Sequence, residues 1–238
     1  MKIFPSIDIY EGKVVRLYKG DYNQMTVYSE NPVEIAKAFK AQGADQIHIV
    51  DLEGARDGTT PNVEVVKKIK DETGLFCEIG GGIRSIEMID AYIDAGLDRV
   101  ILGTAALEDQ DFLKKAIKMY GSKIAVGVDI KDRKVAIKGW VKTSNMDAFE
   151  FCKELQKIGV KTIICTDISK DGAMQGPNIR LYEKLNETFT FNVIASGGVS
   201  SIQDVLKLYE INLYGAIIGK AYYVGAIDLK KAIEVTKW

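Results

Sequence analysis

The sequence predicts an α/β fold, a (β/α)₈ TIM barrel built from two duplicated (β/α)₄ half-barrels. The first observation behind this prediction is a strict alternation of short β-branched runs with longer amphipathic stretches. The second is that the second half of the chain repeats the landmarks of the first at a nearly constant spacing. Eight units in two equivalent groups of four fit a closed barrel better than an open sheet, and closure removes both sheet edges.

Each unit of the barrel is justified by its own pattern. Short runs rich in β-branched residues predict eight strands, at residues 2–7, 46–50, 76–79, 99–102, 124–128, 162–165, 192–195 and 216–218. Apolar residues at helical spacing predict eight helices, at residues 32–41, 63–71, 86–95, 111–119, 147–158, 180–186, 202–209 and 228–236. The alternation implies parallel strands joined by right-handed crossovers.

The internal repeat includes polar residues as well as the core pattern. A spacing of 116 residues relates Gly43 to Gly159, Asp51 to Asp167, Pro61 to Pro177, Asn62 to Asn178, Gly82 to Gly198 and Gly103 to Gly219. The segment around Asp8 returns at a spacing of 121 residues, so Asp129 is the repeat counterpart of Asp8. Since no linker interrupts the repeat, we expect one domain over residues 1–238, with repeats of about 1–120 and 121–238, and a symmetric pair of sites.

The composition of the chain excludes several classes of partner and site. Lys and Arg number 32 against 33 Asp and Glu, with no block of like charges, so nucleic acid and anionic membranes are not expected as partners. Three cysteines without CxxC spacing argue against a disulfide framework and a zinc site. Pro5 and Asp8 come too early for a signal peptide, and no run of 18 apolar residues occurs. We expect a cytoplasmic monomer.

Glycine-rich turns follow the third and seventh strands, at Gly80-Gly81-Gly82-Ile83-Arg84-Ser85 and Ser196-Gly197-Gly198-Val199-Ser200-Ser201. Further turns, Gly103-Thr104-Ala105 and Gly219-Lys220-Ala221, follow the fourth and eighth. Converging backbone N–H groups at helix starts bind anions. A single Gly-Gly is usually only a tight turn, but glycines on adjacent strand exits in both halves predict two phosphate sites. The ligand would be an elongated molecule with a phosphate at each end.

Two carboxylates are expected to face each other across the barrel mouth. Asp8 is predicted to end the first strand and Asp129 the fifth, and these strands are opposed in an eight-stranded barrel. Two carboxylates flanking one reacting centre suit general acid–base catalysis if their pKa values differ. The alternative is that each is a solvated loop acid or a helix cap.

Other polar residues leave alternatives open. Asp51 and Asp167 form the second repeated acid pair, which turn formation and hydrogen bonding explain nearly as well as catalysis. Thr166 replaces the apolar Val50 of the first half and is placed to hydrogen-bond near the acid. His48, the only histidine, is at least as consistent with a packed side chain as with a general base, and metal binding is not expected.

Two segments are candidates for lids that close over the ligand. They are the loops expected at 18–23 after the first strand and at 138–142 after the fifth, each with glycine next to an aromatic residue. Trp140 in the second loop is equally consistent with surface packing.

The motifs resemble a known family, the histidine-biosynthesis isomerase acting on phosphoribosylformimino-aminoimidazole carboxamide ribotide. The resemblance covers essentially the whole chain and rests on Phe4-Pro5-Ser6-Ile7-Asp8, Gly12-Lys13-Val14-Val15-Arg16-Leu17, His48-Ile49-Val50-Asp51-Leu52-Glu53-Gly54-Ala55, Gly80-Gly81-Gly82-Ile83-Arg84, Thr166-Asp167-Ile168-Ser169-Lys170-Asp171-Gly172 and Ser196-Gly197-Gly198-Val199. The related cyclase subunit of imidazole glycerol phosphate synthase typically has Cys where this chain has Ser6, and it lacks the Val50–Ala55 motif.

The resemblance implies an Amadori rearrangement of a bisphosphorylated ribotide, an aminoaldose becoming an aminoketose without cofactor or metal. It implies Asp8 as general base at C2′, Asp129 as general acid that opens the ribose ring, and Thr166 as support for the acid. Substrate-binding and phosphate-binding candidates are Arg16, Gly20, His48, Gly81, Gly82, Arg84, Gly103, Thr104, Trp140, Asp171, Gly172, Ser196, Gly197, Gly198, Gly219 and Lys220. Lys220 departs from the family, in which Arg is common, and replaces a planar fork by a point charge.

Two alternative functions remain. A bifunctional relative would also isomerise phosphoribosylanthranilate by the same chemistry, and an assay with that substrate decides between them. A non-catalytic barrel would bind a phosphorylated metabolite without turnover and would be insensitive to Asp8→Asn.

Overall fold

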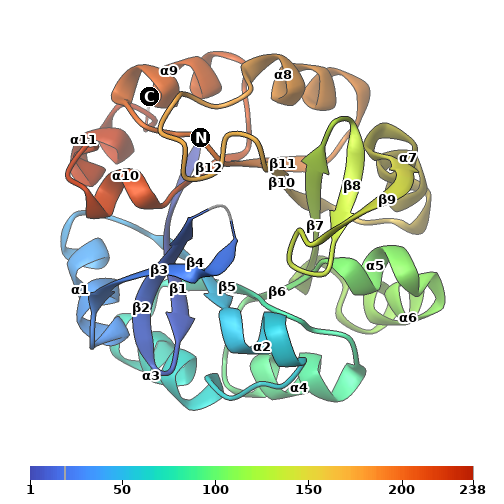
Figure 1. Cartoon of the computed structure of the whole chain (residues 1–238), viewed down its shortest axis with the longest axis horizontal. Coiled ribbons are helices and arrows are strands. Elements are labelled where there is room, and N and C mark those ends of the chain that lie inside the picture. Colours follow the sequence, from blue (N-terminus) through green and yellow to red (C-terminus); the bar gives the residue numbers. More distant parts are fainter. Residues whose placement is uncertain (19, 238) are drawn as a thin grey trace.

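The computed structural model describes residues 1–18 and 20–237, and these residues form a closed eight-stranded barrel inside a ring of helices (Figure 1). The barrel strands are β1 (Lys2–Tyr10), β4 (Gln46–Asp51), β5 (Phe76–Gly80), β6 (Arg99–Leu102), β7 (Ile124–Lys131), β10 (Thr162–Asp167), β11 (Asn192–Ser196) and β12 (Gly215–Ile218). The strands are parallel, and the ring closes where β1 pairs with β12 and β7 pairs with both β6 and β10. The predicted (β/α)₈ fold and all eight predicted strands are confirmed.

The eight predicted helices are also present, with ends shifted by a few residues. They are α1 (Pro32–Ala41), α3 (Val63–Thr73), α4 (Ile86–Asp94), α6 (Gln110–Tyr120), α7 (Ala148–Ile158), α8 (Ile179–Thr188), α9 (Ile202–Glu210) and α11 (Leu229–Glu234). Short elements that the sequence did not predict are α2 (Leu52–Asp57), α5 (Thr104–Glu108), α10 (Lys220–Tyr223) and the 3₁₀ turn η1 (Gly121–Lys123). None of the helices in the described part of the chain is long and apolar enough to cross a membrane.

The repeat extends to the helix caps. Ser85 accepts a hydrogen bond from the Met88 amide at the start of α4, and its counterpart Ser201 accepts one from the Asp204 amide at the start of α9. Each satisfies an amide that the first helical turn leaves without a partner. The two glycine turns therefore run into helices that begin in the same way.

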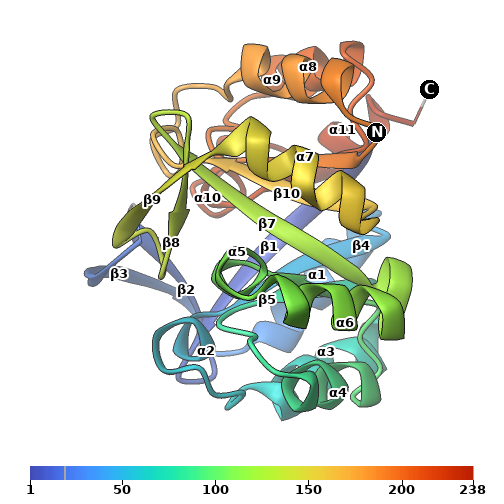
Figure 2. The ribbon, with the colours of Figure 1, turned by 90° about the vertical axis from the view of Figure 1, so that its right-hand side faces the viewer.

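Two β-hairpins replace the predicted lid loops. The first is β2 (Lys13–Tyr18) with β3 (Asp21–Ser29), and the second is β8 (Lys134–Ile137) with β9 (Lys142–Asp147). Both project from the same end of the barrel and lie on opposite sides of its axis (Figures 1 and 2). The predicted segments 18–23 and 138–142 contain the hairpin turns, and Lys19 lies outside the described residues.

The prediction that Asp8 and Asp129 end their strands is wrong. β1 and β7 continue two residues further, because β1 pairs antiparallel with β2 and β7 with β8. In the turn between β7 and β8, Asp132 and Arg133 both have positive φ, the geometry of the two-residue turn that matches the twist of the strands. Both acids therefore lie within strands, where ladder hydrogen bonds fix their backbone.

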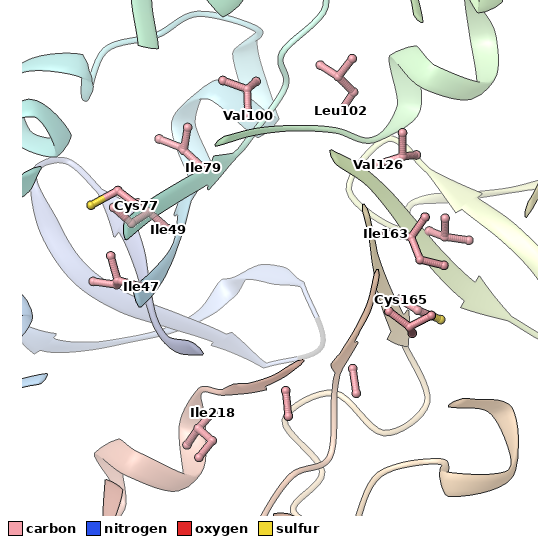
Figure 3. Close-up of a cluster of buried hydrophobic side chains, with 14 of the residues drawn as sticks. Ile47, Ile49, Cys77, Ile79, Val100, Leu102, Val126, Ile163, Cys165 and Ile218 are labelled. Carbon is pink, nitrogen blue, oxygen red and sulfur yellow. The ribbon is translucent and has the colours of Figure 1, made fainter. Parts of the chain in front are cut away.

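The main hydrophobic core lies between the strands and the helices. Figure 3 shows its side chains on the outer face of the strand ring, including Ile47, Ile49, Cys77, Ile79, Val100, Leu102, Val126, Ile163, Cys165 and Ile218. Each buried aliphatic side chain of this kind stabilises the fold by about 1.5–3 kcal/mol. A smaller cluster inside the barrel closes its lower end with Phe4, Ile101, Ala125, Ile164, Ile194 and Ile217.

The inward-facing residues form layers across the barrel, because side chains alternate along each strand. The layer at the mouth aligns Asp8 with Val50 and Gly80 in the first half, and Asp129 with Thr166 and Ser196 in the second. The inward-facing positions beneath it are here named the floor layer. In the first half they are Ser6, His48, Glu78 and Arg99, in register with one another, and in the second half they are Gly127, Ile164, Ile194 and Gly215, also in register with one another. The two sets are offset by four residues, since Val100 pairs with Ile124 and Lys2 with Gly215.

Candidate active site

A cavity of about 840 Å³ opens at the mouth, within the size range of small-molecule sites. The structure brings every site residue predicted from the sequence to its wall: Asp8, Arg16, Gly20, His48, Gly81, Gly82, Arg84, Gly103, Thr104, Asp129, Trp140, Thr166, Asp171, Gly172, Ser196, Gly197, Gly198, Gly219 and Lys220. The carboxyl ends of all eight strands meet here, which is where barrels of this kind carry their chemistry.

The glycine turns pack tightly against neighbouring backbone. A Cβ on Gly82 would lie 1.8 Å from the Gly54 carbonyl oxygen, and one on Gly198 would lie 2.4 Å from that of Gly176. Both glycines also have positive φ. Close packing therefore requires glycine at these turns whether or not they bind an anion, and it also leaves their backbone bare at the cavity wall.

Each half also supplies a cation beside its glycine turn. The Arg84 side chain lies across Gly58, whose added Cβ would meet the guanidinium at 1.1 Å from Nη2. In the second half Lys220 donates from Nζ to the Gly172 carbonyl oxygen at 3.1 Å. The two ends of the cavity thus combine exposed amide groups with a positive side chain, the requirements for seating a phosphate.

Asp8 forms an ion pair beneath the first hairpin. Arg16 on β2 donates from Nη1 to Asp8 Oδ2 at 2.8 Å, and Nη2 hydrogen-bonds the Ser6 hydroxyl. The guanidinium stacks over Tyr223 with its Cζ 5.5 Å from the ring centroid. The ion pair fixes the position of the Asp8 carboxyl group at the cavity wall.

Asp129 lies in a different environment. Burial raises the pKa of this carboxyl, while hydrogen bonds from Trp140 and Thr166 and the charge of His48 act in the opposite direction. Trp140 thus contacts the acid from the second hairpin, which rules out the alternative of a residue that packs only at the surface. The indole ring also lies against Gly20, so the two hairpins meet over the cavity.

A third carboxyl faces the same space. Burial is the main cause that raises the pKa of Asp171 to about 6; the charges of Asp8 and Asp129 act in the same direction, and those of Arg16 and Lys220 oppose it. These electrostatic effects place the three acids near one another at the mouth.

The Asp51 and Asp167 pair organises loops. Asp51 is fully buried and accepts hydrogen bonds from the Gly54 amide at 2.8 Å, the Asn62 side chain at 2.9 Å and the Tyr92 hydroxyl at 3.1 Å. Asp167 accepts corresponding bonds from Ser169 and Asn178. Gly54 and Asn62 follow the strand that carries Asp51, and Ser169 and Asn178 follow the strand that carries Asp167, which favours the turn-forming explanation over catalysis.

Sequence reasoning missed several cavity residues. Tyr22 lines the wall and donates to the Leu52 carbonyl oxygen at 2.8 Å, and Arg56 lines it from α2. Ser6 entered the sequence argument only as a family marker, although its hydroxyl holds Arg16. The β-branched and aromatic residues of Lys13–Tyr18 could have indicated the hairpin strand, but α2 is too short for a periodic signal.

Comparisons with known proteins agree with this geometry. The family described as "Histidine biosynthesis protein" matches residues 2–228. A curated relative from Clostridium beijerinckii is 51% identical over 237 residues, covering 100% of this chain and 99% of the relative. Relatives from Oceanobacillus iheyensis and Lactococcus lactis are also 51% identical, covering 98% and 97% of this chain and 98% and 95% of their own lengths.

All three relatives carry the name 1-(5-phosphoribosyl)-5-((5-phosphoribosylamino)methylideneamino) imidazole-4-carboxamide isomerase. Both the family match and this identity extend over nearly the whole barrel. The chain therefore belongs to the histidine biosynthesis protein family, among relatives named as that isomerase.

Proposed function

We propose that this chain catalyses the Amadori rearrangement of N-(5′-phosphoribosylformimino)-5-aminoimidazole-4-carboxamide ribotide (ProFAR), an aminoaldose, to the aminoketose PRFAR. The observation that carries the proposal is the contrast between two opposed carboxyls. Asp8 is ion-paired with Arg16, whereas burial raises the pKa of Asp129. Pairs of acids whose environments separate their pKa values divide the roles of base and acid between them. The names of the relatives support the same reaction.

The substrate is held by its ends. One phosphate binds at the Gly81–Gly82 turn with Arg84, and the other at the Gly197–Gly198 turn with Lys220. These turns belong to opposite halves of the barrel and line one cavity. A ligand that spans them crosses the mouth between β1 and β7, so its reacting ribose can lie near Asp8 and Asp129 on these strands.

Asp129 acts first, as general acid. Its proton passes to the ring oxygen of the ribose, the C1′–O bond breaks, and the lone pair of the attached nitrogen forms a C=N bond. Thr166 and Trp140 stabilise the carboxylate that remains, since both donate to Asp129.

Asp8 then acts as general base. It removes the proton from C2′, the electron pair forms the C1′=C2′ bond of an enol, and the C=N electrons return to nitrogen. Transfer of the hydroxyl proton away from C2′ oxygen and of a proton to C1′ gives the ketone. The product is an isomer of the substrate, so the sequence needs no other reactant.

The remaining parts of the proposal are a small bisphosphorylated ribotide as the partner and a cytoplasmic monomer. A net charge of −1 without blocks of like charge supports the absence of nucleic-acid and membrane partners.

The test is an isomerisation assay on ProFAR with Asp8→Asn and Asp129→Asn. Each variant is expected to lose at least about 10²-fold in turnover, the scale of acid–base catalysis. Near wild-type turnover in either variant removes that residue from the mechanism. Binding of ProFAR without turnover by the unaltered protein would instead favour a non-catalytic barrel, and turnover of phosphoribosylanthranilate would reveal a second substrate.

A further inference from the structure

The floor layer beneath the acids contains a buried polar chain that the reaction above does not use. His48 Nδ1 lies 2.8 Å from Glu78 Oε1, and Arg99 Nη1 donates to Glu78 Oε2 at 3.0 Å. Glu78 is fully buried, Arg99 is 7% exposed, and the His48 ring lines the cavity. The three residues lie in register on β4, β5 and β6.

We infer that Glu78 and Arg99 are positioning residues that hold the His48 ring with its Nδ1 hydrogen on Glu78 and present Nε2 to a ribose hydroxyl group of the ligand. The choice of ligand rests on the proposed function. The orientation of the ring rests on the contacts alone.

The chemistry of the chain fixes where the hydrogen lies. Arg99 only donates hydrogen bonds, so its salt bridge holds Glu78 as a carboxylate, which only accepts them. The nitrogen that faces Glu78 must therefore carry a hydrogen. No protein partner for Nε2 is found within residues 1–18 and 20–237, and the exposed part of the ring belongs to the cavity wall. Nε2 of His48 therefore faces the ligand, and it is a hydrogen-bond acceptor whenever the ring is neutral.

Arg99 is itself fixed from below. Its guanidinium stacks on Phe76 with Cζ 4.9 Å from the ring centroid, and it hydrogen-bonds Tyr214. Its Nε is buried without a hydrogen-bond partner. An arrangement that leaves a buried donor unsatisfied is poor at stabilising a core, since buried ion pairs rarely outweigh the cost of their desolvation.

The internal repeat shows that a half-barrel can form without the His48–Glu78–Arg99 series. The floor-layer positions equivalent to Ser6, His48, Glu78 and Arg99 in the second half are Gly127, Ile164, Ile194 and Gly215. The equivalent strands of the second half, β7, β10, β11 and β12, thus carry only isoleucine and glycine at these positions. Both halves form the mouth, but only the first half carries the hydrogen-bonded series His48–Glu78–Arg99. A contact with the ligand therefore explains these three residues better than a need of the fold does.

The experiment uses the fact that His48 is the only histidine in the sequence. Protein labelled with ¹⁵N-histidine gives one pair of ring nitrogen signals, and their shifts and couplings show which nitrogen carries hydrogen. The unaltered protein is expected to show hydrogen on Nδ1, and adding PRFAR is expected to shift the Nε2 signal. Hydrogen on Nε2 alone, or no shift with PRFAR bound, would overturn the inference even if no variant folds.

Glu78→Gln tests the role of the carboxylate. Its amide oxygen is expected to accept from Arg99, which turns the NH₂ group toward Nδ1 and moves the histidine hydrogen to Nε2. We expect KM for ProFAR to rise about tenfold, the scale of one hydrogen bond, with a smaller change in kcat. Wild-type spectra and KM in Glu78→Gln would contradict the inference.

Asp98→Asn is the matched control. Asp98 also pairs with a cation, accepting from Lys70 Nζ at 2.6 Å and from the Cys77 amide at 2.7 Å, whereas the His48 ring bonds to Glu78. Asp98→Asn removes a carboxylate from the same half of the barrel, and we expect the ¹⁵N signals of the His48 ring to stay unchanged. Because the signals do not depend on turnover, hydrogen on Nδ1 in a protein that fails to isomerise ProFAR would reject the proposed function and keep the orientation of His48.

Discussion

Adding one methyl group at each of two equivalent glycines tests the Arg16–Asp8 pair. Gly103 and Gly219 have nearly the same backbone conformation, with φ and ψ of −97° and −108° at the first and −107° and −107° at the second. Replacing either glycine by alanine should therefore cause about the same backbone strain. A Cβ at Gly103 meets nothing within 4 Å, whereas one at Gly219 lies 2.1 Å from Arg16 Nη2 and 3.1 Å from the Ser6 hydroxyl.

The expected effect follows from these distances. Ordinary contact begins at 3.4 Å, so in Gly219→Ala the guanidinium must shift by on the order of 1 Å, away from Ser6 and Asp8. Overpacking of this kind costs about 1–3 kcal/mol. We expect the free energy of unfolding of Gly219→Ala to be lower than that of Gly103→Ala by this amount, because the backbone contribution cancels.

Urea denaturation of the two variants measures the difference in stability. ProFAR turnover should fall further in Gly219→Ala as well, by about tenfold relative to Gly103→Ala, since Asp8 loses its partner. Equal stability and equal kcat in the two variants would show that Arg16 moves freely and does not fix Asp8.

Two further substitutions test single hydrogen bonds. Thr166→Val removes a donor that favours the Asp129 carboxylate, so the pKa of Asp129 should rise and the alkaline limb of the kcat/KM profile, where the protonated acid is lost, should move to higher pH. A shift to lower pH would refute the assignment of Asp129 as acid. Tyr92→Phe removes the hydroxyl that donates to buried Asp51 and should cost about 1.5–3 kcal/mol in urea denaturation, because the acceptor is charged. The matched control is Tyr182→Phe, whose side chain is equally buried but loses a bond to the neutral Ser196 carbonyl oxygen. It should cost only about 0.5–1.5 kcal/mol, and the reverse order would contradict this account.

The barrel and its mouth were predictable because their signals are local or repeated. Each strand and helix of the main framework carries its own periodicity, and the 116-residue spacing marks the two halves. Glycines such as Gly82 and Gly198 were recognisable because the repeat preserves them. The structure then places their turns on one cavity.

The hairpins and the floor layer were not predicted, for different reasons. The expectation that a strand ends at its catalytic acid concealed the pairing of β1 with β2, although Val14, Val15 and Tyr18 are residues that favour strands. Glu78 and Arg99 lie in short buried strands where the sequence pattern gives only burial. Their meeting depends on the register between β5 and β6, which no local pattern specifies.

The unequal floor has a consequence for anyone who would rebuild this barrel from identical halves. Fusing two copies of residues 121–238 would give a dry floor of isoleucine and glycine, compatible with folding. Fusing two copies of residues 1–120 would bury two histidines, two glutamates and two arginines inside one barrel, at positions where the C-terminal half now supplies isoleucine and glycine. The C-terminal half is therefore the template to duplicate for a stable scaffold, and the N-terminal half can enter it only once.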